Sequence, residues 1–380
     1  MKVLVIGGTG TMGKPLVDLL YSNNNIITVI CRKKQYDQRN INYLYGNAFD
    51  KSFMDLALNE FYDCIIDFCL YSINDFLDRY DKLLSSTLQY VCLSSAAVYS
   101  INSGLITEDS PRLKETTSEK QIKNNDYYKY GFLKASIEDI LINSGRNNWT
   151  IVRPFITYND NRIPIGEWSE EIWITRTIHG KKVVIPKDLL KYKTTYSYGA
   201  DVAMMIHSVL GKSTCLKQIY NVTSNNYVTW NEVLLACKNA LSKQGYIMKI
   251  KYLEDSTPVF KHFPNMINHY KYNRMTDRCI CSSKIEAEMG HIKYVNMQNQ
   301  IDICVRKYLQ SHNSLKTEIS NDYYIKIHSF MDKYTNDKMM FNLYKGKNKY
   351  RYFRNRYKAI DTLDICLHKV YNKIRHLIIK

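Results

Sequence analysis

A glycine-rich segment near the start of the chain constrains the fold more than any other feature. The short apolar run Val3 to Ile6 is followed at once by the segment Gly7–Gly13, which reads Gly-Gly-Thr-Gly-Thr-Met-Gly, and then by residues with helical periodicity. A strand that turns tightly into a helix in this way presents backbone N–H groups and a helix N-terminus to a pyrophosphate. The sequence therefore predicts a dinucleotide-binding turn, with these residues as contacts: Gly7, Gly10, Thr11, Met12 and Gly13.

Short β-branched runs recur after this turn, with helical patterns between them: Ile26 to Cys31, Asp63 to Phe68, Gln89 to Leu93, and Thr150 to Val152. This alternation predicts an α/β fold with a doubly wound parallel sheet over residues 1–154. From about Phe155 the pattern loosens into long connections of the kind that form pocket floors. We expect a smaller C-terminal substrate lobe over residues 155–310, partly interleaved with the sheet, and a basic helical tail over residues 311–380.

Composition narrows the class of protein and its compartment. The chain has 380 residues, 45% of them hydrophobic, so it can bury a full core. Its first apolar run is too short for a secretory signal or a membrane span. The ten cysteines include one tight pair, Cys279 and Cys281, without the second pair that a tetrahedral metal site needs. We therefore expect a cytoplasmic protein with reduced thiols and no metal.

Two segments have the Tyr-x-x-x-Lys spacing, Tyr130/Lys134 and Tyr334/Lys338, so spacing alone decides nothing. The first pair lies at the start of a predicted helix, after the segment Leu93–Tyr99 (Leu-Ser-Ser-Ala-Ala-Val-Tyr) and before Arg153-Pro154. An i,i+4 spacing places both side chains on one helical face, where the ammonium of Lys134 can stabilise a phenolate. Tyr130 is therefore a candidate general acid and base.

This order of motifs resembles the extended short-chain dehydrogenase/reductase family of NAD(P)-dependent epimerases and dehydratases, and the resemblance covers about residues 1 to 310. It implies a Rossmann sheet, a nicotinamide cofactor, and Ser95, Tyr130 and Lys134 as catalytic residues. Ala96 and Ala97 stand where the dehydratases of the family have an acidic pair, which disfavours dehydration. We therefore expect an epimerase or ketoreductase that acts on a sugar or nucleotide sugar.

The resemblance also implies further ligand contacts. The second predicted strand ends in Cys31-Arg32-Lys33-Lys34, without the acidic residue that usually holds the adenosine ribose. Arg32 can instead pair with a 2′-phosphate, which favours NADP over NAD, although a solvated basic turn is the alternative. Family position adds a further set of expected contacts: Asn47, Ala48, Cys69 and Lys134 for the cofactor, and Ser95, Thr157 and Arg176 for the substrate.

A second hypothesis comes from the segments Trp173–Arg176 and His179–Pro186. They are similar to an atypical branch of the family that includes chloroplast stem-loop RNA-binding proteins. Nearby basic side chains can neutralise either a sugar diphosphate or an RNA backbone: Arg176, Lys181, Lys182 and Lys187. The alternative function is therefore RNA binding on a retained dehydrogenase fold, which does not need an intact Ser95, Tyr130 and Lys134.

The net charge of +17 is unevenly distributed, because residues 341–380 hold eleven Lys/Arg against two Asp, a net of +9. Basic and aromatic residues alternate between Tyr344 and Lys358, and an apolar stripe at helical spacing follows from Ile360 to Leu377. Such a stripe must be buried, either on the protein itself or a partner subunit of a homodimer, or on an anionic membrane surface. Nucleic acid is the less favoured partner. The basic flank favours peripheral contact at the inner face of the membrane.

Overall fold

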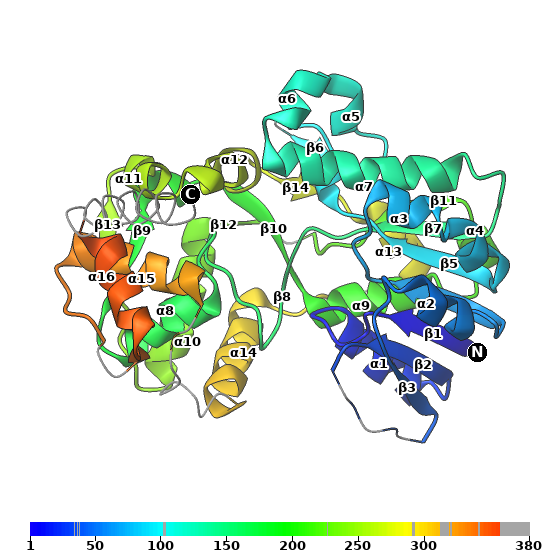
Figure 1. The fold of residues 1–380 in the computed structure, drawn as a ribbon, viewed down its shortest axis with the longest axis horizontal. Helices are drawn as coiled ribbons and strands as arrows, with labels where there is room; N and C mark the ends of the chain where they lie inside the picture. The colour runs from blue at the N-terminus through cyan, green and yellow to red at the C-terminus, as the bar shows by residue number, and fades with distance from the viewer. Residues whose placement is uncertain are drawn as a thin grey trace, which may run out of the picture.

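The computed structural model describes residues 1–357 except 34, 36, 38, 102–103, 226, 291–292, 312–318, 320 and 341–342. The apolar stripe expected after Ile360 falls outside these residues. The described chain forms two lobes that lie side by side (Figure 1). Within it, no helix is both long and apolar enough to cross a membrane, and no group of three or more His, Cys, Asp or Glu side chains could hold a metal ion.

The first lobe is built on a seven-stranded sheet in the order β11-β7-β5-β4-β1-β2-β3. Its strands are β1 Lys2–Ile6, β2 Ile26–Cys31, β3 Ile41–Tyr45, β4 Tyr62–Asp67, β5 Thr87–Leu93, β7 Trp149–Arg153 and β11 Gln218–Asn221. Every neighbouring pair is parallel. The prediction of a doubly wound parallel α/β sheet is confirmed, and β11 joins it from beyond residue 154.

Helices cover both faces of this sheet. One face packs against α1 Gly13–Ser22, α9 Gly199–Ser208 and α13 Ser283–Met289. The other packs against α2 Lys51–Ala57, α3 Ile73–Leu77, α4 Tyr80–Ser85 and α7 Asp126–Ile142. Val3 and Val5 of β1 enter the first core, whereas Leu4 and Ile6 enter the second. Successive side chains point to opposite faces, so a strand covered on both sides is a continuous apolar run.

Helix α7 begins where Asn125 caps it, since the Asn125 side chain accepts hydrogen bonds from the backbone N–H groups of Tyr127 and Tyr128. It packs closely on the short 3₁₀ helix η1 (Ala96–Val98). A Cβ atom at Gly131 would lie 2.3 Å from the carbonyl oxygen of Ala97. Glycine is therefore required at this position for α7 to approach the segment that follows β5.

The second lobe contains two small sheets and several helices. One sheet has the order β12-β10-β8 and the other pairs β13 with β9. Their bounds are β8 Ile156–Tyr158, β9 Lys182–Pro186, β10 Lys193–Tyr198, β12 Tyr227–Thr229 and β13 Lys249–Leu253. The larger helices are α8 Glu170–Ile178, α10 Trp230–Lys243, α14 Met297–Ser311 and α15 Asp322–Thr335. Helix α10 begins with a capping box formed by Thr229 and Glu232.

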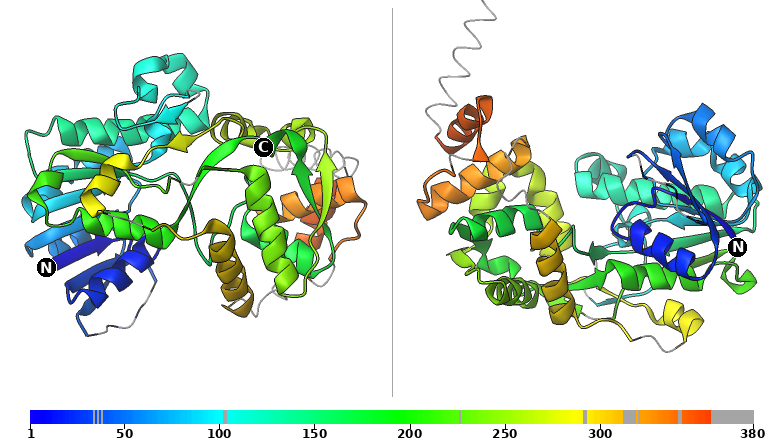
Figure 2. Two further views of the ribbon diagram at one scale, coloured as in Figure 1. Left: turned by 180° about the vertical axis from the view of Figure 1, so that it is seen from behind. Right: turned by 90° about the horizontal axis from the view of Figure 1, so that it is seen from below.

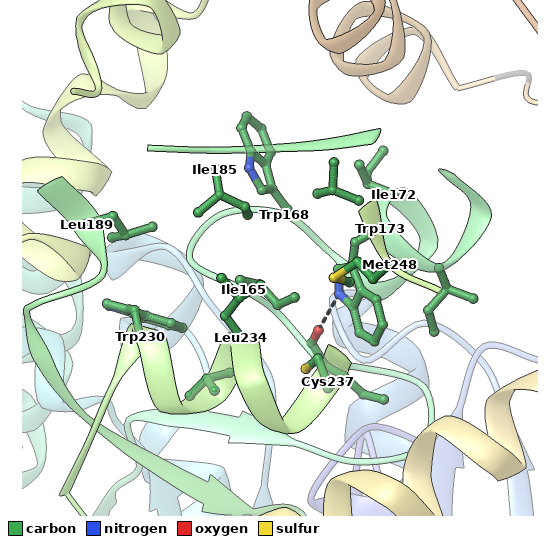
Figure 3. Packing of buried hydrophobic residues seen from close by; sticks show 14 of the residues in the cluster. Ile165, Trp168, Ile172, Trp173, Ile185, Leu189, Trp230, Leu234, Cys237 and Met248 are labelled. Carbon is green, nitrogen blue, oxygen red and sulfur yellow. Dashed lines mark hydrogen bonds between the residues drawn. The ribbon is translucent and has the colours of Figure 1, made fainter. Parts of the chain in front are cut away.

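Three tryptophans organise the core of this lobe (Figure 3). Trp168, Trp173 and Trp230 are completely buried. Each indole N–H donates to a backbone carbonyl, so no polar atom of these rings is left unpaired. Shorter elements complete the two lobes: β6 Leu105–Ile106, α5 Leu113–Thr116, α6 Glu119–Lys123, α11 Thr257–His262, α12 Ile267–His269, the π-helix η5 Tyr270–Arg274 and β14 Cys279–Ile280.

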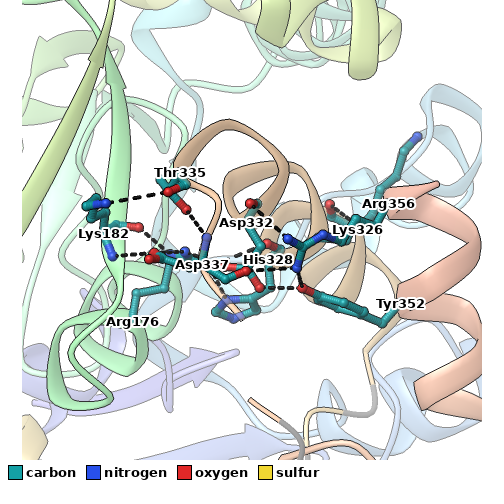
Figure 4. Close-up of polar contacts among 10 residues, drawn as sticks. Arg176, Lys182, Lys326, His328, Asp332, Thr335, Asp337, Tyr352 and Arg356 are labelled. Atoms are coloured by element: carbon teal, nitrogen blue, oxygen red, sulfur yellow. Dashed lines mark hydrogen bonds and ion pairs between the residues drawn. The ribbon is translucent and has the colours of Figure 1, made fainter. Parts of the chain in front are cut away.

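The C-terminal extension is joined to the second lobe by a buried ionic network (Figure 4). Arg176 of α8 lies 2.6 Å from the carboxylate of Asp332 on α15. The hydroxyl of Tyr352, on α16 (Lys347–Arg356), donates to the same carboxylate, and Arg356 donates to that hydroxyl. Helices α15 and α16 are therefore part of the second lobe rather than separate from it.

Candidate functional site

The glycines of the first turn have three different structural roles. Gly7 has a φ of +78°, which few side chains tolerate. A Cβ atom at Gly13 would lie 2.8 Å from the backbone of Gly8, so α1 packs directly on the turn. A Cβ atom at Gly10 would have nothing within 4 Å. Gly10 therefore faces open space, where a ligand can approach the backbone closely.

A cavity of about 390 Å³ lies at the carboxyl ends of β1 to β4, next to this turn. Its lining includes these predicted cofactor contacts: Gly7, Gly10, Arg32, Asn47, Ala48 and Cys69. It also includes Phe49 and Leu70, whose side chains are 44% and 46% exposed although both are large and apolar. A flat apolar group can cover them, so the lining suits an adenine ring. Sequence reasoning missed these two residues, because nothing in the pattern distinguishes them from core positions.

Burial shifts the pKa of a carboxyl and of a thiol beside this cavity. Asp67, at the end of β4, is buried and accepts hydrogen bonds from the Cys69 backbone N–H and the Tyr90 hydroxyl. Burial raises the pKa of the Asp67 carboxyl, and the nearby ammonium of Lys134 opposes that shift. Burial also raises the pKa of the Cys69 thiol to about 12. Cys69 is therefore a neutral contact for a cofactor at neutral pH.

The structure brings the three predicted catalytic residues to the carboxyl end of β5. Lys134 is buried, and its Nζ donates to the carbonyl oxygen of Leu93 at 2.6 Å. Ser95 follows two residues later and is half-buried, and its Oγ accepts from the Ala97 backbone N–H at 3.2 Å. Tyr130 is half-buried on α7, adjacent to the Gly131 contact with Ala97. Ser95 is part of the short segment Leu93 to Ala97, and the turn of α7 from Tyr130 to Lys134 therefore lies next to it.

Arg153 of the Arg-Pro motif stabilises the helix that carries Tyr130 and Lys134. Arg153, the last residue of β7, makes a bidentate ion pair with Glu138 of α7, at 2.8 Å and 2.7 Å. Both side chains are almost completely buried. Arg153 also donates to the hydroxyl of Tyr99, which in turn donates to Asn221 on β11. Arg153 therefore anchors the helix that carries Tyr130 and Lys134, a role that its sequence position did not reveal.

The structure places the two predicted substrate residues of the second lobe differently. Thr157 is buried, and its hydroxyl and carbonyl oxygens accept from Arg162, an exposed residue that sequence reasoning missed. Arg176 is completely buried and its guanidinium pairs with Asp332 and Asp337. The substrate contact predicted for Arg176 is contradicted by this placement, because the carboxylates of the C-terminal extension occupy the guanidinium.

The same placement weakens the RNA interpretation of this basic segment. The backbone N–H of Lys182 donates to Asp337, and its Nζ donates to the carbonyl oxygen of Thr335. Lys187 forms an ion pair with Glu254 at 2.7 Å. Three of the four basic residues considered for an RNA backbone are therefore engaged within the protein.

Comparison with known proteins agrees with this geometry. Residues 3–223 match the sequence model of the NAD dependent epimerase/dehydratase family. A curated relative, the chloroplast stem-loop binding protein of 41 kDa b from Arabidopsis thaliana, is 25% identical over 259 residues. That match covers 63% of this chain and 63% of the relative, so it spans less than two thirds of the relative's length.

Solved structures share the fold. The UDP-glucose 4-epimerase of Thermotoga maritima with UDP-glucose has a TM-score of 0.62 at 16% identity, over 82% of this chain and 99% of that chain. The Bordetella bronchiseptica enzyme WbmH in complex with NAD⁺ has a TM-score of 0.60 at 16% identity, with the same coverage. The UDP-glucuronic acid 4-epimerase of Bacillus cereus in complex with NAD has a TM-score of 0.60 at 14% identity, over 82% and 97%. Since the family model covers more than half of the sequence, the chain belongs to the NAD-dependent epimerase/dehydratase family.

Proposed function

We propose that the protein is an NAD(P)-dependent epimerase or ketoreductase that acts on a sugar or nucleotide sugar. The observation that carries the proposal is the meeting of Ser95, Tyr130 and Lys134 at the end of β5, in the same sheet edge as the cofactor cavity. Epimerases of UDP-glucose and UDP-glucuronic acid are among the structures with this fold, which supports a nucleotide sugar.

Each catalytic residue has a defined part in this chemistry. When bound, the nicotinamide accepts and returns a hydride at the reacting carbon. Tyr130 takes the proton of the substrate hydroxyl as the hydride leaves, and returns it when a carbonyl is reduced. Ser95 donates a hydrogen bond to the same oxygen and fixes its position. The ammonium of Lys134 stabilises the phenolate of Tyr130 and can also hold the nicotinamide ribose.

The choice of dinucleotide belongs to the same proposal. Arg32 is exposed and lines the cofactor cavity at the end of β2, where its guanidinium can pair with a 2′-phosphate. We therefore propose NADP as the preferred cofactor. Two of the three solved structures described above are complexes with NAD, and titration with each dinucleotide distinguishes the two cofactors.

The cellular setting completes the proposal. The described cysteines are all free thiols, which supports a reducing compartment such as the cytoplasm. We also propose contact of the basic tail with the inner face of the membrane, because α16 has five Lys/Arg and no acidic residue in its sequence. A homodimer is a further part of the proposal.

Substitution of Tyr130 by Phe tests the proposal. Interconversion of UDP-hexoses is followed by chromatography, and NADH and NADPH binding by fluorescence. Tyr130→Phe should retain cofactor binding and lose at least about a hundredfold in turnover, the usual contribution of one acid/base group. Tyr334→Phe is the matched control, because Tyr334 has the same spacing to a lysine but lies on α15. Turnover equal to that of the unmodified protein in Tyr130→Phe would contradict the assignment.

A further inference from the structure

A second cavity, of about 500 Å³, lies on the other side of the glycine-rich turn. Thr9 and Gly10 line both this cavity and the cofactor cavity, so the turn is the wall between them. The new cavity is also lined by Lys14 of α1 and by Lys307 of α14, which belongs to the second lobe. Figure 2 shows α14 at the junction of the two lobes. A cationic side chain from the second lobe therefore lies beside the dinucleotide-binding turn.

The segment just before helix α14 is joined to helix α9, which packs against the glycine-rich turn. A Cβ atom at Gly199, the first residue of α9, would lie 2.5 Å from the carbonyl oxygen of Thr11. Two residues later, Asp201 accepts a hydrogen bond from the Val295 backbone N–H at 3.3 Å, just before α14 begins. The apolar face of α14 packs into the core of the second lobe, and Asp302 pairs with Lys243 of α10. Lys307 is left exposed on the cavity side.

The lining of the cavity includes two cations that can approach an anion at the turn. Its lining has two lysines, Lys14 and Lys307, and two carboxylates, Asp18 and Asp160. Neither lysine has an ion pair in the described part of the chain. A cavity of this volume is about 10 Å across, which is within one Debye length at 0.1 M ionic strength. The flexible four-carbon stem of a lysine lets its ammonium extend from the cavity wall towards the turn.

We propose that Lys307 contributes positive charge to the binding of the cofactor's diphosphate group, so that the second lobe takes part in holding the cofactor. The inference rests on the proposed function, since it requires a dinucleotide at the turn. Its consequence is that cofactor affinity depends on the position of α14, and therefore on how the two lobes are held together.

Charge reversal at two adjacent positions of α14 tests this inference. NADH affinity is measured by fluorescence for the full chain, for Lys307→Glu and for Arg306→Glu. Arg306 is also exposed but does not line the cavity. The Arg306→Glu variant therefore controls for a general change in electrostatic potential. Lys307→Glu should weaken NADH binding about three- to tenfold, on the scale of one reversed surface interaction. Arg306→Glu should change it less than about twofold, and 1 M salt should remove most of the difference.

Competition by fragments of the cofactor shows which part of the cofactor Lys307 affects. Lys307→Glu should weaken competition by ADP and leave competition by adenosine unchanged, because only ADP has the diphosphate. Equal weakening by both α14 variants, or equal loss for ADP and adenosine, would overturn the inference. If Lys307→Glu does not fold, Lys307→Met is used, with an expected loss of about two- to threefold. A full chain that binds neither NADH nor NADPH refutes the proposed function as well, whereas normal binding with no effect at Lys307 refutes the inference alone.

Discussion

Removal of Arg153 should be among the most damaging single changes in the first lobe. In Arg153→Met, the completely buried carboxylate of Glu138 loses two charge-assisted hydrogen bonds, and Arg112 remains 3.6 Å away. Breaking a buried pair by removing one partner costs about 3–5 kcal/mol, because the remaining charge stays uncompensated. Replacing both partners with apolar residues is often neutral. We therefore expect Arg153→Met to cost about 3–5 kcal/mol and Arg153→Met/Glu138→Leu to recover most of that loss.

Urea unfolding followed by circular dichroism measures these differences. Lys114→Met is the matched control, because Lys114 pairs with Asp139 on the same helix at 2.6 Å, but both side chains are partly exposed. That pair should contribute less than about 1 kcal/mol. Two results would refute the reasoning: a loss below about 1 kcal/mol in Arg153→Met, or a double variant whose loss equals the sum of the two single losses.

Three further predictions follow from the same structure. Arg32→Ala should remove most of a preference for NADPH over NADH, which fluorescence titration measures. If NADH binds more tightly and the substitution has no effect, Arg32 is only a surface charge. Burial raises the pKa of Asp201 from 3.8 to about 6, so its contribution to stability is present below pH 4 and lost as pH rises through 6. Asp201→Asn should therefore be more stable at pH 7 by up to about 3 kcal/mol in urea unfolding, with no difference near pH 3. Deleting residues 340–380 should weaken co-sedimentation with anionic vesicles, by about 1 kcal/mol per lost surface Lys or Arg, and equal co-sedimentation would remove the membrane hypothesis. The deletion should also lower the melting temperature, because Asp332 loses Tyr352.

The parts of the fold that the sequence predicted are those with local causes. The strand, glycine turn and helix over residues 2–22 are specified by neighbouring residues. The spacing of Tyr130 and Lys134 places both on one helix, and its relation to Ser95 follows from the order of parallel strands. β3 and β11 escaped prediction because the former has polar and half-exposed residues and the latter is only four residues long.

The parts that the sequence did not predict depend on partners far along the chain. Arg176 looks like a ligand contact because it lies in a basic segment beside a predicted pocket. Its actual partner, Asp332, is 156 residues away on a helix that the pattern did not connect to this lobe. The role of Arg153 also depends on tertiary contacts, which it makes with Glu138 on the preceding helix α7 and with Tyr99, 54 residues away. The local sequence pattern shows which chemical group a side chain carries. Tertiary contacts decide whether that side chain is available to a ligand.

The buried arginines do not contribute to the net charge of +17, because each is paired with a carboxylate. A strongly basic chain suggests a polyanion as partner, but only charges that reach solvent contribute to such binding. Arg153, Arg176 and Arg274 are nearly or fully buried and neutralised by Glu138, Asp332 and Glu167. Each of these pairs has no net charge, so the basic surplus of the chain lies outside them. Exposed positive charge also lies at Arg32, Lys14 and Lys307, around the glycine-rich turn at which we propose that the diphosphate binds.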